Sequence, residues 1–232
     1  MNLTVRQGSP GKIGVEIIAH RGANREAPEN TIPAFERALD IGVHGIELDV
    51  HVTRDNVPIV HHDPVLPDGG RIDRMASVDL ERRTDAPTLS QVLELVHGRC
   101  HLYVEIKAPA AVIPSVELLN GMTEWCSVHS FDHRIALVSR SLLPDMTTGI
   151  LLVSRLVDPA YALHAAKSTD LWQHADYIDS DLIAEAHSEG ARVIAWTVNE
   201  VSRARELKAI GVDGICTDSP RELLLGLSES AS

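Results

Sequence analysis

The chain has 232 residues, a length that suits one domain with a large apolar core and falls within the range of a single α/β barrel. Its formal net charge of −12 makes it a poor partner for nucleic acid or an anionic membrane surface, so we expect neither nucleic-acid binding nor stable membrane association. An anionic small-molecule substrate would need local positive charge, from a bound cation or from Arg and Lys.

The cysteines and the N-terminal segment bear on the compartment. Cys100, Cys126 and Cys216 are an odd number without CxxC spacing, so they indicate neither a disulfide framework nor a structural zinc site. Free thiols are typical of a reducing compartment. Residues 1–14 are polar and lack the apolar core of a signal peptide, and no apolar run approaches membrane-spanning length. The sequence therefore predicts a cytoplasmic protein.

Extended and helical patterns alternate along the chain. An apolar run at 15–19 comes first, and helical spacing follows at 31–39, with Thr31 as N-cap and Gly42 just past its end. The next helix, at 89–96, has Thr88 or Ser90 as its cap. The full pattern predicts strands at 15–19, 45–50, 57–60, 102–107, 125–130, 148–153, 176–179, 192–198 and 214–218, and helices at 31–39, 89–96, 114–119, 134–143, 160–167, 182–189 and 202–210.

This alternation, with short connections, is typical of parallel βα units. Apart from the short run at 57–60, eight strands, most of them followed by a helix, predict an α/β protein with the (β/α)8 TIM barrel fold, as a single domain over residues 1–232; an open eight-stranded sheet is the alternative. The irregular stretch 64–87 predicts a short excursion after the second strand. In such a barrel the active site lies at the C-terminal ends of the strands.

An acidic alternation marks the second strand. In Gly45-Ile46-Glu47-Leu48-Asp49-Val50 the acidic residues alternate with apolar ones, so a strand would point Glu47 and Asp49 out of the same face. Glu105 and Lys107 repeat the spacing in a later strand. Helices cover the outside of barrel strands and leave few solvated faces. Carboxylates gathered on one face repel each other unless a cation lies between them, so the pattern points to chemistry.

A set of short motifs, in order from His20 to about Pro220, resembles the glycerophosphodiester phosphodiesterase family. Any one motif would be weak, but the ordered set is specific. The motifs are His20-Arg21-Gly22, Pro28-Glu29-Asn30-Thr31, Ala34-Phe35, Gly45-Ile46-Glu47-Leu48-Asp49-Val50, Thr53-Arg54-Asp55, Val60-His61-His62-Asp63, Pro87-Thr88-Leu89, Glu105-Ile106-Lys107, Ser130-Phe131 and Trp196-Thr197-Val198-Asn199.

The resemblance implies a metal-dependent barrel enzyme that hydrolyses glycerophosphodiesters to glycerol 3-phosphate and an alcohol, through a cyclic phosphate formed by the neighbouring glycerol hydroxyl. Carried over by position, the metal ligands are Glu47, Asp49 and Glu105, the acid/base pair is His20 and His62, and the phosphate contacts are Arg21 and Lys107. Carboxylate ligands suit one Ca²⁺ or Mg²⁺ ion, with Mn²⁺ also open. Imidazole titrates near neutral pH and can serve as acid or base.

Two aromatic residues are candidates for the substrate pocket. Trp196 could stack on an alcohol headgroup, and its face would suit a quaternary ammonium, but core packing is an equal reading for Trp196 and for Phe131. The segment 64–87 is shorter than in the family and strongly charged, which favours an open site for water-soluble diesters over a lipid-binding lid. The headgroup, the oligomeric state and the division of acid and base between the histidines stay open.

Two other functions compete with this interpretation. A lysophospholipase D would use the same site on a lipid substrate, and activity on glycerophosphocholine against lysophosphatidylcholine separates the two. A barrel that binds a phosphate ligand without turnover is the third hypothesis, and the complete set of His, acidic and Lys residues argues against it.

Overall fold

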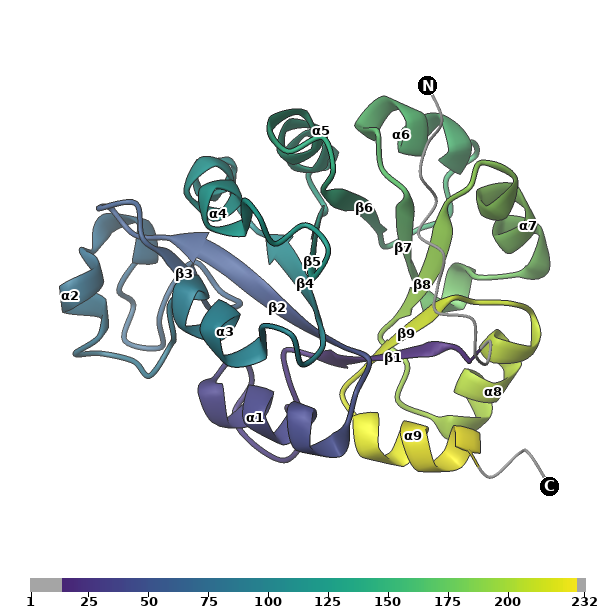
Figure 1. Cartoon of the computed structure of the whole chain (residues 1–232), viewed down its shortest axis with the longest axis horizontal. Coiled ribbons are helices and arrows are strands. Elements are labelled where there is room, and N and C mark those ends of the chain that lie inside the picture. The colour runs from purple at the N-terminus through teal and green to yellow at the C-terminus, as the bar shows by residue number, and fades with distance from the viewer. Residues whose placement is uncertain (1–13, 229–232) are drawn as a thin grey trace.

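A computed structural model describes residues 14–228, and these form a closed barrel (Figure 1). Within them, eight parallel strands make a ring that closes where β1 pairs with both β2 and β9. These strands are β1 (Glu16–His20), β2 (Gly45–Val52), β4 (His101–Ile106), β5 (Cys126–Ser130), β6 (Thr147–Leu152), β7 (Asp170–His174), β8 (Arg192–Trp196) and β9 (Gly214–Thr217). The predicted TIM barrel is confirmed. The prediction about a signal peptide concerns residues that lie, except for Gly14, outside the described part of the chain.

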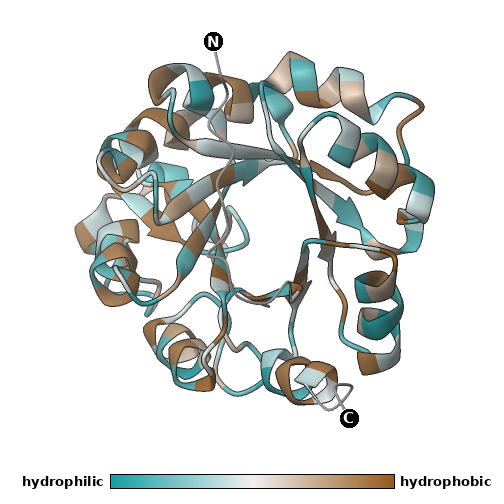
Figure 2. Cartoon of the chain, turned by 45° about the vertical axis from the view of Figure 1, so that its right-hand side comes forward, coloured by the Kyte–Doolittle hydropathy of each residue, from teal (hydrophilic) through white to brown (hydrophobic). Residues whose placement is uncertain are grey.

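Helices enclose the ring on its outside, as Figure 2 shows. They are α1 (Ile32–Ile41), α3 (Leu89–Val96), α4 (Val112–Leu119), α5 (His133–Leu142), α6 (Pro159–Ala166), α7 (Ser180–Ser188), α8 (Val201–Ala209) and α9 (Pro220–Ser228). Among residues 14–228, no helix combines the length and the apolar character needed to cross a membrane.

Local sequence signals set several helix ends. Thr31 caps α1 by accepting a hydrogen bond from the Ala34 amide, and Gly42 ends that helix in the left-handed conformation, with φ of 81°. Thr88, and not Ser90, caps α3 through a reciprocal capping box with Gln91. Thr31 and Thr88 thus fix where α1 and α3 begin, and Gly42 fixes where α1 ends before β2.

Large side chains fill the interior of the barrel. Tyr103 and Trp172 are buried there, and their rings meet edge to face with centroids 5.2 Å apart. Glycines on neighbouring strands make room for them: a Cβ at Gly45 would lie 2.7 Å from the Tyr103 ring, and one at Gly149 would lie 2.8 Å from the Trp172 ring. The barrel below the strand ends is therefore a packed core.

The excursion at 64–87 follows β3 (Pro58–Val60), which pairs antiparallel with β2 and lies outside the ring of parallel strands. A short 3-10 helix, η1 (Ile72–Arg74), and a single helical turn, α2 (Ser77–Leu80), follow beyond the end of β2, at the left of Figure 1. The charged segment nevertheless has its own small core, made of Ile59, Leu66, Ile72 and Leu80.

The seventh strand lies earlier than the sequence pattern predicts. The prediction of a strand at 176–179 is wrong: β7 covers Asp170–His174, and a 3-10 helix, η3 (Ala175–Tyr177), follows it. The strand was missed because Asp170, Gln173 and His174 break its apolar pattern. Two of them are buried with polar partners, since Asp170 pairs with Arg192 and Gln173 donates to the carbonyl oxygen of Leu152. Helix α9 was also not predicted.

Candidate active site

The strand register gathers the predicted residues at the C-terminal mouth of the barrel. His20, the last residue of β1, is level with Glu47 on β2. Asp49 is level with Glu105 on β4, and Glu105 with His129 on β5. Glu47, Asp49, Glu105 and His129 are all buried. The alternation therefore does point both β2 carboxylates into the barrel, as predicted.

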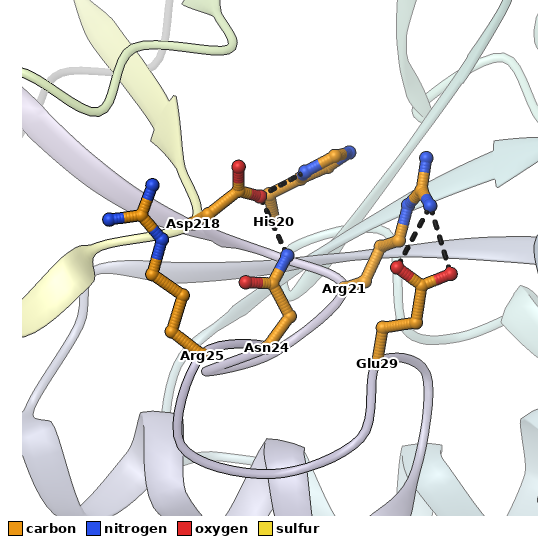
Figure 3. Close-up of a pocket in the computed structure, with 6 residues that line it drawn as sticks. All are labelled: His20, Arg21, Asn24, Arg25, Glu29 and Asp218. Atoms are coloured by element: carbon orange, nitrogen blue, oxygen red, sulfur yellow. Dashed lines mark hydrogen bonds and ion pairs between the residues drawn. The ribbon is translucent and has the colours of Figure 1, made fainter.

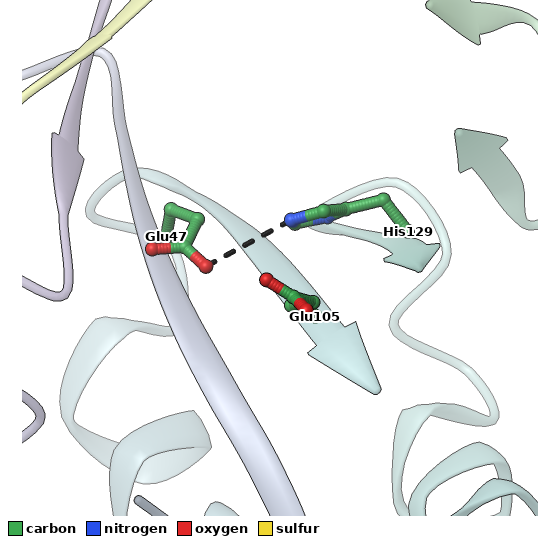
Figure 4. Close-up of side chains that lie close together, drawn as sticks. All are labelled: Glu47, Glu105 and His129. Atoms are coloured by element: carbon green, nitrogen blue, oxygen red, sulfur yellow. Dashed lines mark ion pairs between the residues drawn. The ribbon is translucent and has the colours of Figure 1, made fainter. Parts of the chain in front are cut away.

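In the described residues, Glu47, Glu105 and His129 form a close group of potential metal ligands (Figure 4). Their ligand atoms lie within 4.8 Å of one another, and Nε2 of His129 is 3.8 Å from Oε1 of Glu47. The His129 ring stacks flat on Trp172, with centroids 4.2 Å apart and planes 7° apart. The sequence interpretation did not single out His129. His129 occupies an inward-facing position of β5, level with Glu105, and the alternation of that strand is the signal that could have identified it.

Asp49 lies in the same mouth but is held by cations and an amide. Its Oδ2 accepts a hydrogen bond of 2.8 Å from Asn30 and lies 3.1 Å from Nε of Arg21. Lys107 Nζ lies 3.2 Å from Oδ1 of Asp49 and 2.8 Å from Oε1 of Glu105. Burial alone would raise the pKa of Asp49, but the charges of Lys107 and Arg21 outweigh it and lower that pKa.

The pKa of Glu105 shifts in the opposite direction to that of Asp49. Burial, and then the negative charge of Asp49, raise its pKa above the ordinary value, although Lys107 opposes the shift. Two buried carboxylates this close favour a positive charge between or beside them. Lys107 supplies one such charge, and the Glu47–Glu105–His129 group offers a place for another.

Arg21 is fixed by a sharp turn after β1. Its φ of 57° is left-handed, and Gly22 follows with φ of 80°, where a Cβ would lie 2.8 Å from the backbone of Ala34. The turn lets the Arg21 amide donate to Oε2 of Glu47 at 3.1 Å, while its guanidinium donates to both Glu29 oxygens. The two predicted phosphate contacts, Arg21 and Lys107, thus converge on Asp49.

His20 faces an open cleft of about 410 Å³ (Figure 3). The cleft is lined by His20, Arg21, Asn24, Arg25, Glu29 and Asp218. Nδ1 of His20 lies 2.7 Å from Oδ1 of Asp218, and its Nε2 lies 4.0 Å from Oε2 of Glu47. Burial would lower the pKa of His20, but the hydrogen bond to Asp218 and the charge of Glu47 raise it.

His62 is held less firmly than His20. It follows β3, just before the excursion, and its Nδ1 lies 2.9 Å from Oδ1 of the adjacent, exposed Asp63. Nε2 of His51, which lies on β2 two residues after Asp49, is 3.0 Å from the backbone oxygen of His62. The structure therefore ties the His62 backbone to β2 and leaves its side chain 36% exposed.

The chain matches the model of the glycerophosphoryl diester phosphodiesterase family over residues 20–222. It belongs to this family. The predicted resemblance is thereby confirmed, and the chain is an enzyme of the phosphodiester hydrolase class.

Similar proteins cover nearly the whole chain. A glycerophosphodiester phosphodiesterase of Caldanaerobacter subterraneus is 29% identical, over 90% of this chain and 96% of that protein. The YhdW protein of Bacillus subtilis is 30% identical, over 88% of this chain and 94% of that protein. The crystal structure of a glycerophosphodiester phosphodiesterase from Parabacteroides distasonis has a TM-score of 0.85 at 28% identity, over 96% of this chain and all of that one.

The two aromatic residues predicted as pocket candidates in this family member lie together at the mouth. The Phe131 and Trp196 rings meet edge to face with centroids 5.4 Å apart, and His174 lies against the same Trp196 at 5.5 Å. Phe131 is 43% exposed, with Nζ of Lys107 6.0 Å from its ring centre. Phe131 is therefore not a core residue, and the pair adjoins the Lys107 side of the carboxylate cluster.

Proposed function

We propose that the protein hydrolyses glycerophosphodiesters to glycerol 3-phosphate and an alcohol at the mouth of the barrel, with one divalent cation as cofactor. The observation that carries this proposal is the group of three buried carboxylates, Glu47, Asp49 and Glu105, flanked by two cations and His20. We treat residues 1–232 as one domain with this activity, and we place the enzyme in the cytoplasm because its three cysteines are an odd number without CxxC spacing.

The residues present fit a hard divalent ion. Glu47, Asp49 and Glu105 bring three negative charges, while Arg21 and Lys107 bring two positive ones, so the buried group is left with a net negative charge. Glu47 and Glu105 would hold the ion, with Asp49 or His129 completing the set. Carboxylate oxygens favour Ca²⁺ or Mg²⁺, and the imidazole would also be accepted by Mn²⁺. When bound, such an ion supplies Lewis-acid stabilisation of the phosphate.

The protein's own residues divide the remaining work. Arg21 and Lys107 would stabilise negative charge that grows on the phosphate oxygens during the reaction. His20 and His62 approach from different segments, the end of β1 and the residues just before the excursion. One can take a proton from the attacking hydroxyl while the other gives a proton to the leaving oxygen. Phe131 and Trp196 would contact the alcohol headgroup.

The attacking group in this proposal is the neighbouring hydroxyl of the substrate's own glycerol. Its attack on phosphorus gives a cyclic phosphate and releases the alcohol, and water then opens the ring. A substrate analogue without the vicinal hydroxyl should therefore not turn over. Rapid hydrolysis of such an analogue would refute the cyclic route while leaving the phosphodiesterase activity intact.

One assay tests the activity and the ion together. Release of glycerol 3-phosphate is measured with several headgroups after chelation, then after addition of Ca²⁺, Mg²⁺ or Mn²⁺. We expect activity to be lost on chelation, to return with at least one ion, and to be abolished in His20→Ala and His62→Ala. No return with any ion would refute the metal dependence, and no product under any condition would refute the activity.

The alternatives are not favoured by the comparisons. Both are addressed when lysophosphatidylcholine is added as a substrate and release of choline is measured, because its hydrolysis would yield lysophosphatidic acid and choline and no glycerol 3-phosphate. Faster turnover of that lipid than of every glycerophosphodiester would indicate a lysophospholipase D. Tight ligand binding without any turnover would indicate a binding protein.

A further inference from the structure

Asp218 is the residue beside His20 that the proposed roles leave unused. It follows the last strand of the barrel, β9, which pairs with β1 so that Thr217 is level with Ala19. His20 follows Ala19 and Asp218 follows Thr217, so the two residues lie side by side at the ends of adjacent strands. Closure of the barrel brings them together across 198 positions of sequence, at the edge of the cleft in Figure 3.

Three side chains converge on the Asp218 carboxylate. His20 Nδ1 lies 2.7 Å from Oδ1, Asn24 donates to the same oxygen at 2.6 Å, and Asn199 donates to Oδ2 at 2.8 Å. Asn199 is itself oriented, because its Oδ1 accepts from the Asp218 amide at 2.9 Å and from the Thr217 hydroxyl at 3.2 Å. The carboxylate is thus fixed on both of its oxygens.

This arrangement decides which His20 nitrogen carries hydrogen. Burial would raise the pKa of Asp218, but the hydrogen bonds from His20, Asn24 and Asn199 outweigh it and hold that pKa well below its ordinary value. An ionised carboxylate only accepts hydrogen bonds, so Nδ1 of His20 must be the donor. The other ring nitrogen, Nε2, is then directed toward Glu47, into the site.

We propose that Asp218, fixed by Asn24 and Asn199, is a positioning residue that holds His20 with hydrogen on Nδ1 and directs Nε2 to exchange a proton with the substrate. When Nε2 gives up a proton to a substrate oxygen, the ring becomes the neutral Nδ1–H form; when Nε2 takes one, the ring becomes the cation. In both directions Nδ1 keeps its hydrogen. This role rests on the proposed phosphodiesterase function.

The two histidines then differ in how they are held. His62 has beside it the carboxylate of the adjacent Asp63, which is 69% exposed. Exposed pairs of this kind contribute little to order or stability. We therefore expect the position and the hydrogen-bearing nitrogen of His20 to be set by the protein before substrate arrives.

The first experiment measures the hydrogen position directly. Protein labelled with ¹⁵N-histidine is examined by NMR at a pH where His20 is neutral, with His20→Gln used only to assign the signal. We expect the wild-type ring to carry hydrogen on Nδ1, and the Asp218→Asn protein to show a mixture of both forms or the Nε2–H form. A wild-type ring with hydrogen on Nε2 would overturn the proposal, whether or not Asp218→Asn folds.

The second experiment is kinetic. Asp218→Asn keeps the shape of the side chain but removes its charge, so kcat should fall by roughly 10²- to 10⁴-fold, by analogy with carboxylate–histidine pairs in other hydrolases. KM should stay within about threefold if Asp218 acts only through His20 and does not touch substrate. A matched control is Glu189→Gln, which alters a carboxylate 2.9 Å from His164 on the outer helices and should leave kcat unchanged.

The outcomes separate the two proposals. If kcat of Asp218→Asn stays within threefold of the wild type, the positioning role is wrong. If KM rises while kcat holds, Asp218 contacts substrate instead of positioning His20. If the wild-type protein has no phosphodiesterase activity, the proposed function fails, and the NMR measurement still decides whether Asp218 sets the hydrogen on His20.

Discussion

Replacing Arg192 by Met should destabilise the barrel at the end opposite the active site. Arg192 begins β8 and donates two hydrogen bonds to Asp170 on β7, at 3.0 and 2.8 Å, one to Glu16 on β1 at 3.1 Å, and one to the Tyr103 hydroxyl on β4 at 3.2 Å. Asp170 is only 1% exposed. The substitution keeps the aliphatic stem and leaves that carboxylate buried without its cation.

The expected size follows from burial. Removing one partner of a buried ion pair costs roughly 3–5 kcal/mol. The Arg192 side chain is 31% exposed, so water screens part of the interaction and we expect a loss of about 2–4 kcal/mol in the free energy of unfolding. For a domain of this size that corresponds to a fall in Tm of about 4–16 °C, at roughly 2–4 °C per kcal/mol. Calorimetry or circular dichroism measures the difference.

A matched control separates the effect of burying the carboxylate partner from the effect of removing the arginine. Arg155 is equally exposed, at 31%, but it pairs with Asp179, which is 64% exposed, and with Glu185. Arg155→Met should therefore cost about 1 kcal/mol or less. A double variant of Arg192→Met with Asp170→Leu should recover most of the loss, since it leaves no buried charge. Equal losses for Arg192→Met and Arg155→Met would refute the reasoning.

Three further predictions concern the metal site, the barrel interior and the excursion. A divalent ion at about 100 times its Kd should raise the free energy of unfolding by about 2.7 kcal/mol, and Glu105→Gln should abolish most of that gain in a thermal-shift titration. Gly45→Ala should cost about 1–3 kcal/mol in urea unfolding, because its Cβ would lie 2.7 Å from the Tyr103 ring; a loss below 0.5 kcal/mol, on the order of a surface change, would contradict this. Hydrogen bonds from Thr53 and Ser77 lower the pKa of Asp55 to about 2. A lowered pKa stabilises the fold above the ordinary value of 3.8, and this contribution is lost as pH falls toward 2. The Ser77 amide, which donates to Asp55 at 2.9 Å, should thus be better protected from hydrogen exchange in the wild type than in Asp55→Asn near pH 6, and the difference should shrink as pH falls through 2.

Much of the fold could be predicted because its signals are local. The apolar run of β1, the helical spacing of α1 with its Thr31 cap, and the buried run of β2 are each legible within about ten residues. The same alternation placed Glu47 and Asp49 on one inward face. The pattern failed at β7, because the polar residues of that strand are satisfied by partners on other strands that a local window does not contain.

The candidate site, like the fold, could be predicted from the sequence only in part. The sequence by itself determined the family, the barrel and the set of residues at the strand ends, since motifs and periodicity are properties of neighbouring positions. Only the tertiary structure decided that His129 joins Glu47 and Glu105, that Asp49 faces Arg21 and Lys107, and that Asp218 lies against His20. These contacts depend on strand register and on the closure of β1 against β9, which bring together residues as far as 198 positions apart.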